Sequence, residues 1–204
     1  MLSNAERKLC DSLQIDTALI GAIRSRNSNE IRPFQYSLSK IFENGVMRYD
    51  DPIFRPGLVF PEQNAKSYPL VFALKDSFKK KGYRIFVLEN NFDIGKEPDR
   101  IGVLKTADQF EVLKQVGTDG INYGITNDSL VAIMRKFDRK YWLDLVGASG
   151  DWCEFMIQSE PGSWLEFAKE VYAVCPDVVD QGTETVEALA EHLQASKRLY
   201  FWWD

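Results

Sequence analysis

The chain has 204 residues, of which 45% are hydrophobic and 27% charged, as in an ordinary globular protein. A chain of this length forms one good core, or a core with a small helical attachment, without disulfides or metals. The formal net charge is −5, and Lys and Arg are scattered among Asp and Glu. This pattern lacks the basic face of a nucleic-acid binder, so we expect no nucleic-acid partner.

Cysteine usage and hydropathy exclude two further classes of protein. Cys10, Cys153 and Cys175 are far apart, odd in number and without C-x-x-C spacing, which argues against a disulfide framework or a cysteine zinc site. Apolar runs stay well short of the ~20 residues of a membrane span. We therefore predict a reduced, cytoplasmic protein with no membrane segment and no cofactor.

Residues 1–60 are predicted to form a helical N-terminal region. Ser3 and Glu6 have the spacing of a capping box at a helix start. Helices are expected from there to about Gly45, because the following apolar residues repeat with a helical period: Phe34, Leu38, Ile41 and Phe42. A boundary is predicted between Asp50 and Pro61, where prolines and Gly57 are concentrated.

Residues 61–204 are predicted to form an α+β domain. Expected strands are 83–88, 100–105, 143–148 and 152–157. Expected helices are 62–81, one opening at Thr106, one from Asn127, one capped by Ser163 and one from about Thr183. From Arg100 onward this order predicts a ferredoxin-like plait, a mostly antiparallel sheet with helices packed on one face.

The last apolar run, Leu199 to Trp203, is closed by Asp204. Five bulky apolar residues would be insoluble if they were loose, so we predict a strand inside a sheet and covered on both faces. That strand would tie the preceding helices to the core.

Three segments resemble the domain of unknown function 4253 family. They are Gly117–Tyr123, the stretch from Val171 through Cys175–Gly182, and Leu199–Asp204. The resemblance extends from about Pro61 to the last residue. It implies a bacterial accessory protein, and by analogy a small acidic immunity protein that neutralises a secreted toxin.

No catalytic set is evident among the usual nucleophiles and bases. His192 is the only histidine and has no orienting partner nearby, so we interpret it as a partly exposed helix residue. Cys175 ends a helix, where the helix dipole raises a thiol pKa, and a buried apolar role is preferred. The sequence therefore favours a protein without enzymatic activity.

Polar residues in three loops are candidates for binding, each with a structural alternative. Asp177, Asp180 and Gln181 would hold a cation or perform acid–base chemistry, although capping of backbone amides is preferred. Asp119 and Asn122 lie in the glycine-rich stretch 117–124, which is either a ligand loop or a structured turn. Near predicted strand ends, the acids Asp151, Glu154 and Asp204 would either hold a cation, pair with an Arg of a partner, or be neutralised by an internal Arg or Lys.

Our first hypothesis is a non-catalytic protein-interaction module, of the immunity type, that binds a basic toxin surface through an acidic and aromatic face. The candidate binding residues are Asp119, Asn122, Asp151, Asp177, Asp180, Gln181, Trp203 and Asp204. The alternatives are a carboxylate-dependent hydrolase that uses some of the same acids, and a small-ligand sensor whose 117–124 loop closes over its ligand.

Overall fold

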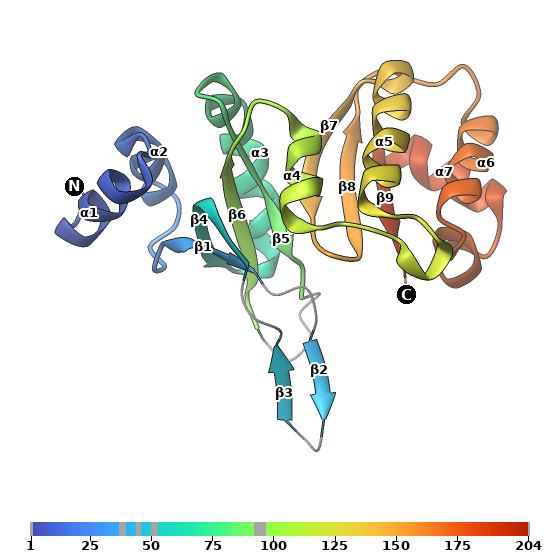
Figure 1. Ribbon diagram of the computed structural model, residues 1–204. Coiled ribbons are helices and arrows are strands. Elements are labelled where there is room, and N and C mark those ends of the chain that lie inside the picture. Colours follow the sequence, from blue (N-terminus) through green and yellow to red (C-terminus); the bar gives the residue numbers. More distant parts are fainter. Residues whose placement is uncertain (1, 37–39, 44–45, 50–52, 92–96, 204) are drawn as a thin grey trace. The chain divides into compact units, whose positions relative to one another are not determined.

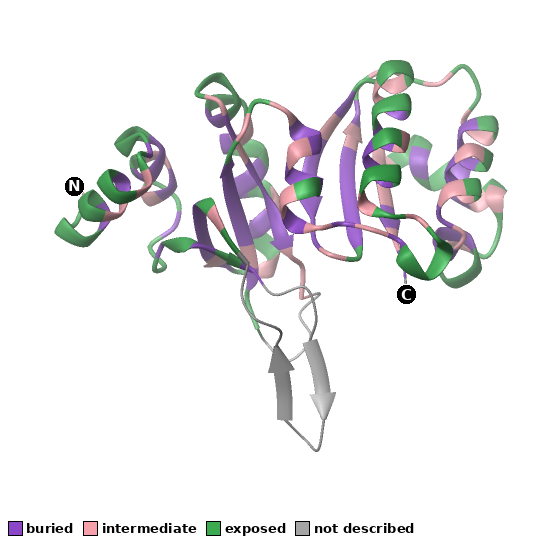
Figure 2. Cartoon of the chain, viewed as in Figure 1, coloured by how far each residue is buried: buried purple, intermediate pink, exposed green. Residues whose placement is uncertain are grey.

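The computed structural model describes residues 2–36, 40–43, 46–49, 53–91 and 97–203 (Figure 1). It divides into two compact units, Met1–Gln115 and Val116–Asp204. Each unit combines helices with antiparallel strands, and a larger share of the strand residues than of the helix residues is buried (Figure 2). The predicted α+β class is thereby confirmed. Among the described residues, no helix is long and apolar enough to cross a membrane.

The N-terminal unit contains a sheet of strand order β1-β4-β6-β5, in which every neighbouring pair is antiparallel. Its strands are β1 (Arg32–Tyr36), β4 (Ile53–Glu62), β5 (Tyr83–Glu89) and β6 (Asp99–Lys105). Its helices are α1 (Asn4–Leu13), α2 (Thr17–Arg24), α3 (Asn64–Lys80) and α4 (Gln109–Val116), whose last residue begins the next unit. A separate hairpin pairs β2 (Lys40–Glu43) with β3 (Val46–Tyr49).

One face of this sheet is covered by α3, which packs on β5 and β6. Its buried residues recur at intervals of three and four, which places them on one side of the helix: Ser67, Leu70, Val71, Leu74 and Phe78. On β6, Gly102 lies beneath two aromatic rings. A Cβ atom there would lie 2.8 Å from Phe86 Cζ and 3.1 Å from Phe34 Cε2. The two rings can pack this closely on the strand because residue 102 is a glycine.

The predicted helical region ends earlier than the sequence indicated. The capping box of Ser3 and Glu6 is present, but the helices stop at Arg24, and Phe34 is a buried residue of β1. Residues 40–43 are a strand as well, while Leu38 and Gly45 lie outside the described residues. The prediction was wrong because four apolar residues fit a helical period by chance, and pairing with the distant β4 decides the conformation.

The predicted division at 60/61 falls inside β4. That strand pairs with β1 on one side and with β6 on the other. The prolines at 56 and 61 therefore belong to a strand whose residues 58–60 are buried, and the chain divides between residues 115 and 116 instead.

The C-terminal unit contains strands in the order β7-β8-β9, all antiparallel. The strands are β7 (Leu143–Ala148), β8 (Trp152–Ile157) and β9 (Arg198–Trp202), and the helices are α5 (Asn127–Tyr141), α6 (Trp164–Val174) and α7 (Val186–Ser196). Strands 143–148 and 152–157 are confirmed with the predicted bounds. The last helix begins at Val186, later than predicted, because Val178–Thr183 forms a π-helical turn.

The final strand is confirmed, but its cover is one-sided. Leu199 and Phe201 are fully buried, whereas Arg198, Tyr200 and Trp202 are only half-buried. The next residue, Trp203, is buried again at 4% exposure. The terminal aromatic residues are therefore part of the core, with one face of the strand partly open.

The strand pairings differ from those of a ferredoxin-like plait. In that plait the first strand, here β6, would lie beside the last strand, here β9. Instead β6 pairs with β4 and β5 along its two edges, and β9 pairs with β8. The order of elements along the chain fits the plait, but β4 and β5 occupy the backbone groups that the plait would require.

The first prediction concerns Gly57 in β4. A Cβ atom at this position would overlap the carbonyl oxygen of Val103 in β6, so Gly57→Ala should lower the free energy of unfolding by about 2 kcal/mol. The matched control is Gly21→Ala in α2, where a Cβ meets nothing within 4 Å and helix propensity should add about 0.5–1 kcal/mol. Urea unfolding measures both, and equal stabilities of the two variants would contradict the register of β4 on β6.

Candidate functional site

In the C-terminal unit, the loop 117–125 is a closed turn. The backbone amides of Gly120 and Ile125 each donate to the other's carbonyl, at 2.9 and 3.1 Å. At its start, Thr118 Oγ1 donates to the carbonyl of Ser149, and the amide of Asp119 donates to the carbonyl of Gly150 at 2.9 Å. The loop is thereby fixed to the turn between β7 and β8, which supports the structured-turn interpretation.

Trp203 packs against this closed turn. A Cβ atom on Gly120 would lie 2.8 Å from Trp203 Cδ1, so the indole occupies the space that any other residue at 120 would fill. The ring stacks on Phe201 with centroids 5.8 Å apart and planes 3° apart. The backbone amide of Trp203 donates to the carbonyl of Asp151 at 3.0 Å. Trp203 is therefore a buried packing residue.

Trp202 makes the equivalent contact with a second glycine. A Cβ atom on Gly182 would lie 2.9 Å from Trp202 Cη2. The thiol of Cys175 donates to the carbonyl of Trp202 at 2.8 Å. Burial raises the pKa of the Cys175 thiol to about 11, so this residue is not a nucleophile at neutral pH. We call the packing of Trp202 on Gly182 and of Trp203 on Gly120 the Trp–Gly interlock.

Asp177 is the buried carboxylate of this region, with 1% exposure. It accepts hydrogen bonds from the hydroxyl of Tyr123 and from Gln181 Nε2, the latter at 3.0 Å. The hydrogen bond to Asp177 raises the pKa of Tyr123 to about 12. Asp177 thus joins the closed turn to the segment after α6.

The preferred capping role of Asp177 and Asp180 is not what the structure shows. Asp177 precedes the π-helical turn but makes no side-chain cap, and the amide end of α7 is capped by Thr185. Asp180 accepts from the hydroxyl of Tyr172 at 3.0 Å. Hydroxyl groups of Tyr123, 54 positions from Asp177, and of Tyr172, eight positions from Asp180, are partners that the sequence did not suggest.

The remaining candidate residues have simpler surroundings. Asp119 Oδ1 accepts from the amide of Ile121 at 3.2 Å, which stabilises the turn. Asn122, Asp151 and Gln181 are exposed, and Asp204 lies outside the described residues. The structure therefore brings Asp119, Asn122, Asp177, Gln181 and Trp203 to one region, with Asp151 reaching it through its backbone carbonyl.

Sequence reasoning missed the apolar residue at the tip of this turn. Ile121 is 62% exposed and Tyr123 is 41% exposed, both within the 3₁₀ turn Ile121–Tyr123. An isoleucine inside a polar, glycine-rich loop was the available signal. Single exposed apolar side chains are common on protein surfaces, so what distinguishes Ile121 is the fixed conformation of the turn that carries it.

Among the described residues, no group of three or more His, Cys, Asp or Glu side chains is arranged to hold a metal ion. His192 is exposed, as expected for a helix-surface residue. Glu154, a second buried acid of this unit, is ion-paired with Arg198.

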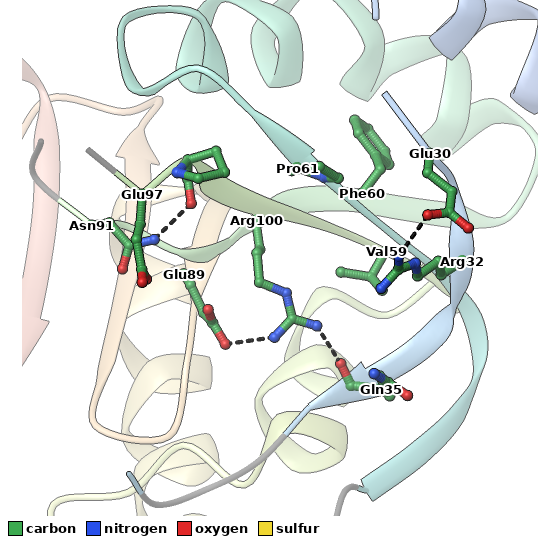
Figure 3. Close-up of a pocket in the computed structure, with 11 residues that line it drawn as sticks. Glu30, Arg32, Gln35, Val59, Phe60, Pro61, Glu89, Asn91, Glu97 and Arg100 are labelled. Atoms are coloured by element: carbon green, nitrogen blue, oxygen red, sulfur yellow. Dashed lines mark hydrogen bonds and ion pairs between the residues drawn. The ribbon is translucent and has the colours of Figure 1, made fainter. Parts of the chain in front are cut away.

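The N-terminal unit contains a cavity of about 480 Å³ that the sequence did not indicate (Figure 3). Arg100 lies near its centre. One terminal nitrogen of its guanidinium donates to Glu89 Oε1 at 2.8 Å, and the other donates to the carbonyl of Gln35 at 2.7 Å. A second pair, Arg32 and Glu30, lines the same cavity at an N–O distance of 2.6 Å.

A buried carboxylate joins two segments that border this cavity, Asn91 on one side and Pro98–Asp99 on the other. Asp99 accepts from the amide of Asn91 at 2.8 Å and from the hydroxyl of Ser67 in α3. Asn91 Nδ2 in turn donates to the carbonyl of Pro98 at 2.7 Å. Since the lining residues are separated by up to about 70 positions, no local sequence pattern marks the cavity.

Fold and site together define an α+β protein whose C-terminal unit is organised by the Trp–Gly interlock. The model of one family, described as "Domain of unknown function (DUF4253)", matches residues 100–204. The chain belongs to this family, and all three segments that carried the resemblance lie inside the matched region. The comparison with curated proteins and the comparison with solved structures gave no match.

The second prediction tests the interlock. Gly120→Ala should lower the free energy of unfolding by about 1–3 kcal/mol, because the new methyl group collides with the indole of Trp203. Gly162→Ala, where a Cβ meets nothing within 4 Å, is the control and should change stability by less than about 0.5 kcal/mol. If Gly120→Ala combined with Trp203→Phe showed no coupling in a double-mutant cycle, the packing contact would be refuted.

The third prediction concerns the pH dependence of Tyr123. Its pKa is raised from 10.0 to about 12 by the hydrogen bond to Asp177, so the folded state favours the neutral phenol. The resulting stabilisation is complete below pH 10 and is lost as the pH rises through about 12. The stability of the wild type relative to Tyr123→Phe should therefore decline over this window in urea titrations, and a constant difference from pH 9 to 12 would refute the hydrogen bond.

Proposed function

We propose that this protein is a non-catalytic protein-interaction module that binds its partner through the closed turn 117–125 of the C-terminal unit. The observation that carries the proposal is the exposure of Ile121 on a turn that the Trp–Gly interlock and Asp177 hold in place. A pre-organised apolar side chain loses little entropy when it binds, so it is well suited to be the centre of an interface.

Charge favours a basic partner. Residues 116–204 contain fifteen Asp and Glu but only seven Lys and Arg, whereas residues 1–115 contain fifteen and eighteen. The negative charge of the whole chain therefore comes from its C-terminal unit. Around the turn, Asp119 is half-buried and Asp180 is exposed. An acidic rim around an apolar centre attracts and orients a partner with a positive surface.

An immunity-type role is the form of this function that we propose for a bacterial, cytoplasmic protein. A toxin that acts on nucleic acid needs a basic surface to bind phosphates. An acidic module that covers this surface would block the toxin without any chemistry of its own. The acidic balance of residues 116–204 supports this form of the proposal.

A carboxylate-dependent hydrolase is less well supported by the geometry. Such an enzyme needs two carboxylates that converge in a pocket. Among the described residues around the closed turn, Asp177 has the buried carboxylate. Its Oδ1 already accepts hydrogen bonds from the side chains of Tyr123 and Gln181. Closure of loop 117–125 over a ligand is likewise opposed by the backbone bonds that fix the turn.

The fourth prediction tests this function by affinity purification from the native cell. The wild-type chain should recover one basic protein in stoichiometric amount, and Ile121→Asn should lower the recovery at least about tenfold, as expected for the centre of an interface. Trp142→Asn is the matched control: Trp142 is 69% exposed in the same unit, and asparagine tolerates its φ of 48°.

Both variants should keep the melting temperature of the wild type, because both side chains are exposed. Recovery of no stoichiometric protein would contradict the proposal. So would equal recovery by Ile121→Asn and the wild type.

A further inference from the structure

We propose that the cavity of the N-terminal unit binds a small zwitterion of the α-amino acid type, with its carboxylate on Arg100 and Arg32 and its ammonium group on the flanking glutamates. This site lies outside the C-terminal unit to which the protein-interaction function is assigned. Its volume of about 480 Å³ is in the range of small-molecule sites and is ample for an amino acid.

The guanidinium of Arg100 is fixed in position but not saturated. Its bonds to Glu89 Oε1 and to the carbonyl of Gln35 use two of the five N–H donors of an arginine. The side chain is 29% exposed and lines the cavity, so a ligand there can contact it. A guanidinium held from two sides is pre-organised to receive a carboxylate in a bidentate geometry.

A second cation reaches the same cavity from β1. Arg32 is paired with Glu30, but its side chain is 62% exposed. A ligand carboxylate could therefore bind it without a rearrangement of the backbone. Figure 3 shows Arg100 between Arg32 on one side and Glu89 and Glu97 on the other. Each arginine has a glutamate as its ion-pair partner, so both charges are present on the two sides of the cavity.

The mixture of charges favours a ligand that carries both signs. Three glutamates and two arginines line the cavity, so a purely anionic or purely cationic ligand would match only part of the lining. A ligand with one carboxylate and one ammonium group satisfies both sets of charges. Val59 and Pro61 add an apolar wall against which the side chain of an amino acid would pack.

The fifth prediction is tested by isothermal titration calorimetry of the full chain with the twenty common L-amino acids. At least one should bind, and neither its decarboxylated amine nor its deaminated carboxylic acid should bind with comparable affinity. Arg32→Gln should weaken binding about tenfold, since it removes one charge-assisted hydrogen bond. Arg26→Gln, which removes an exposed cation outside the cavity, should leave the affinity unchanged.

Three results would overturn the proposal. The first is that no amino acid binds. The second is that the carboxylic acid alone binds as tightly as the amino acid, which would make this an anion site. The third is that Arg32→Gln and Arg26→Gln bind equally well. Because Arg32 is exposed, its variant should fold like the wild type, and circular dichroism verifies this.

Discussion

The packing of two consecutive tryptophans against two glycines is the constraint on which the C-terminal unit depends. Trp203 fills the space above Gly120, and Trp202 fills the space above Gly182. Neither contact tolerates a Cβ atom, because the indole rings already lie within 3 Å of where it would be. The last strand, the closed turn and the segment after α6 are therefore parts of one packed arrangement.

In this arrangement, buried residues hold the closed turn in place, and other residues are exposed on it. Trp203, Asp177 and Cys175 are buried and make their bonds within the unit. Ile121 lies on the turn that they hold, and its side chain faces solvent. The motifs that resemble the family thus have a structural explanation, whereas the specificity of any interaction would depend on the exposed residues that the motifs position.

Helix caps and a short hairpin could be predicted from the sequence, whereas the pairing of distant strands could not. Ser3 and Ser163 cap their helices as expected, since a cap involves residues only three positions apart. The hairpin of β7 and β8 was predictable because a short turn joins two apolar runs. The strand at Phe34 and the departure from the plait both depend on distant strands, β4 above all, whose positions no local pattern specifies.

The same distinction holds for the sites. Polar residues of the loops were identifiable as a group, but the bond from Tyr123 to Asp177 spans 54 positions and was not foreseen. The cavity around Arg100 was missed altogether, because its charged groups come from separate strands and loops. In both places the chemistry results from the fold bringing together residues that are far apart in the sequence.

The most direct test of the account is amide hydrogen exchange of the closed turn in Trp203→Ala. The amides of Asp119, Gly120 and Ile125 donate hydrogen bonds within or beside the turn, and removing the indole should lower their protection far more than that of α5. If their protection fell no more than that of Leu130 in α5, Trp203 would not be what holds the turn, and the central claim would be contradicted.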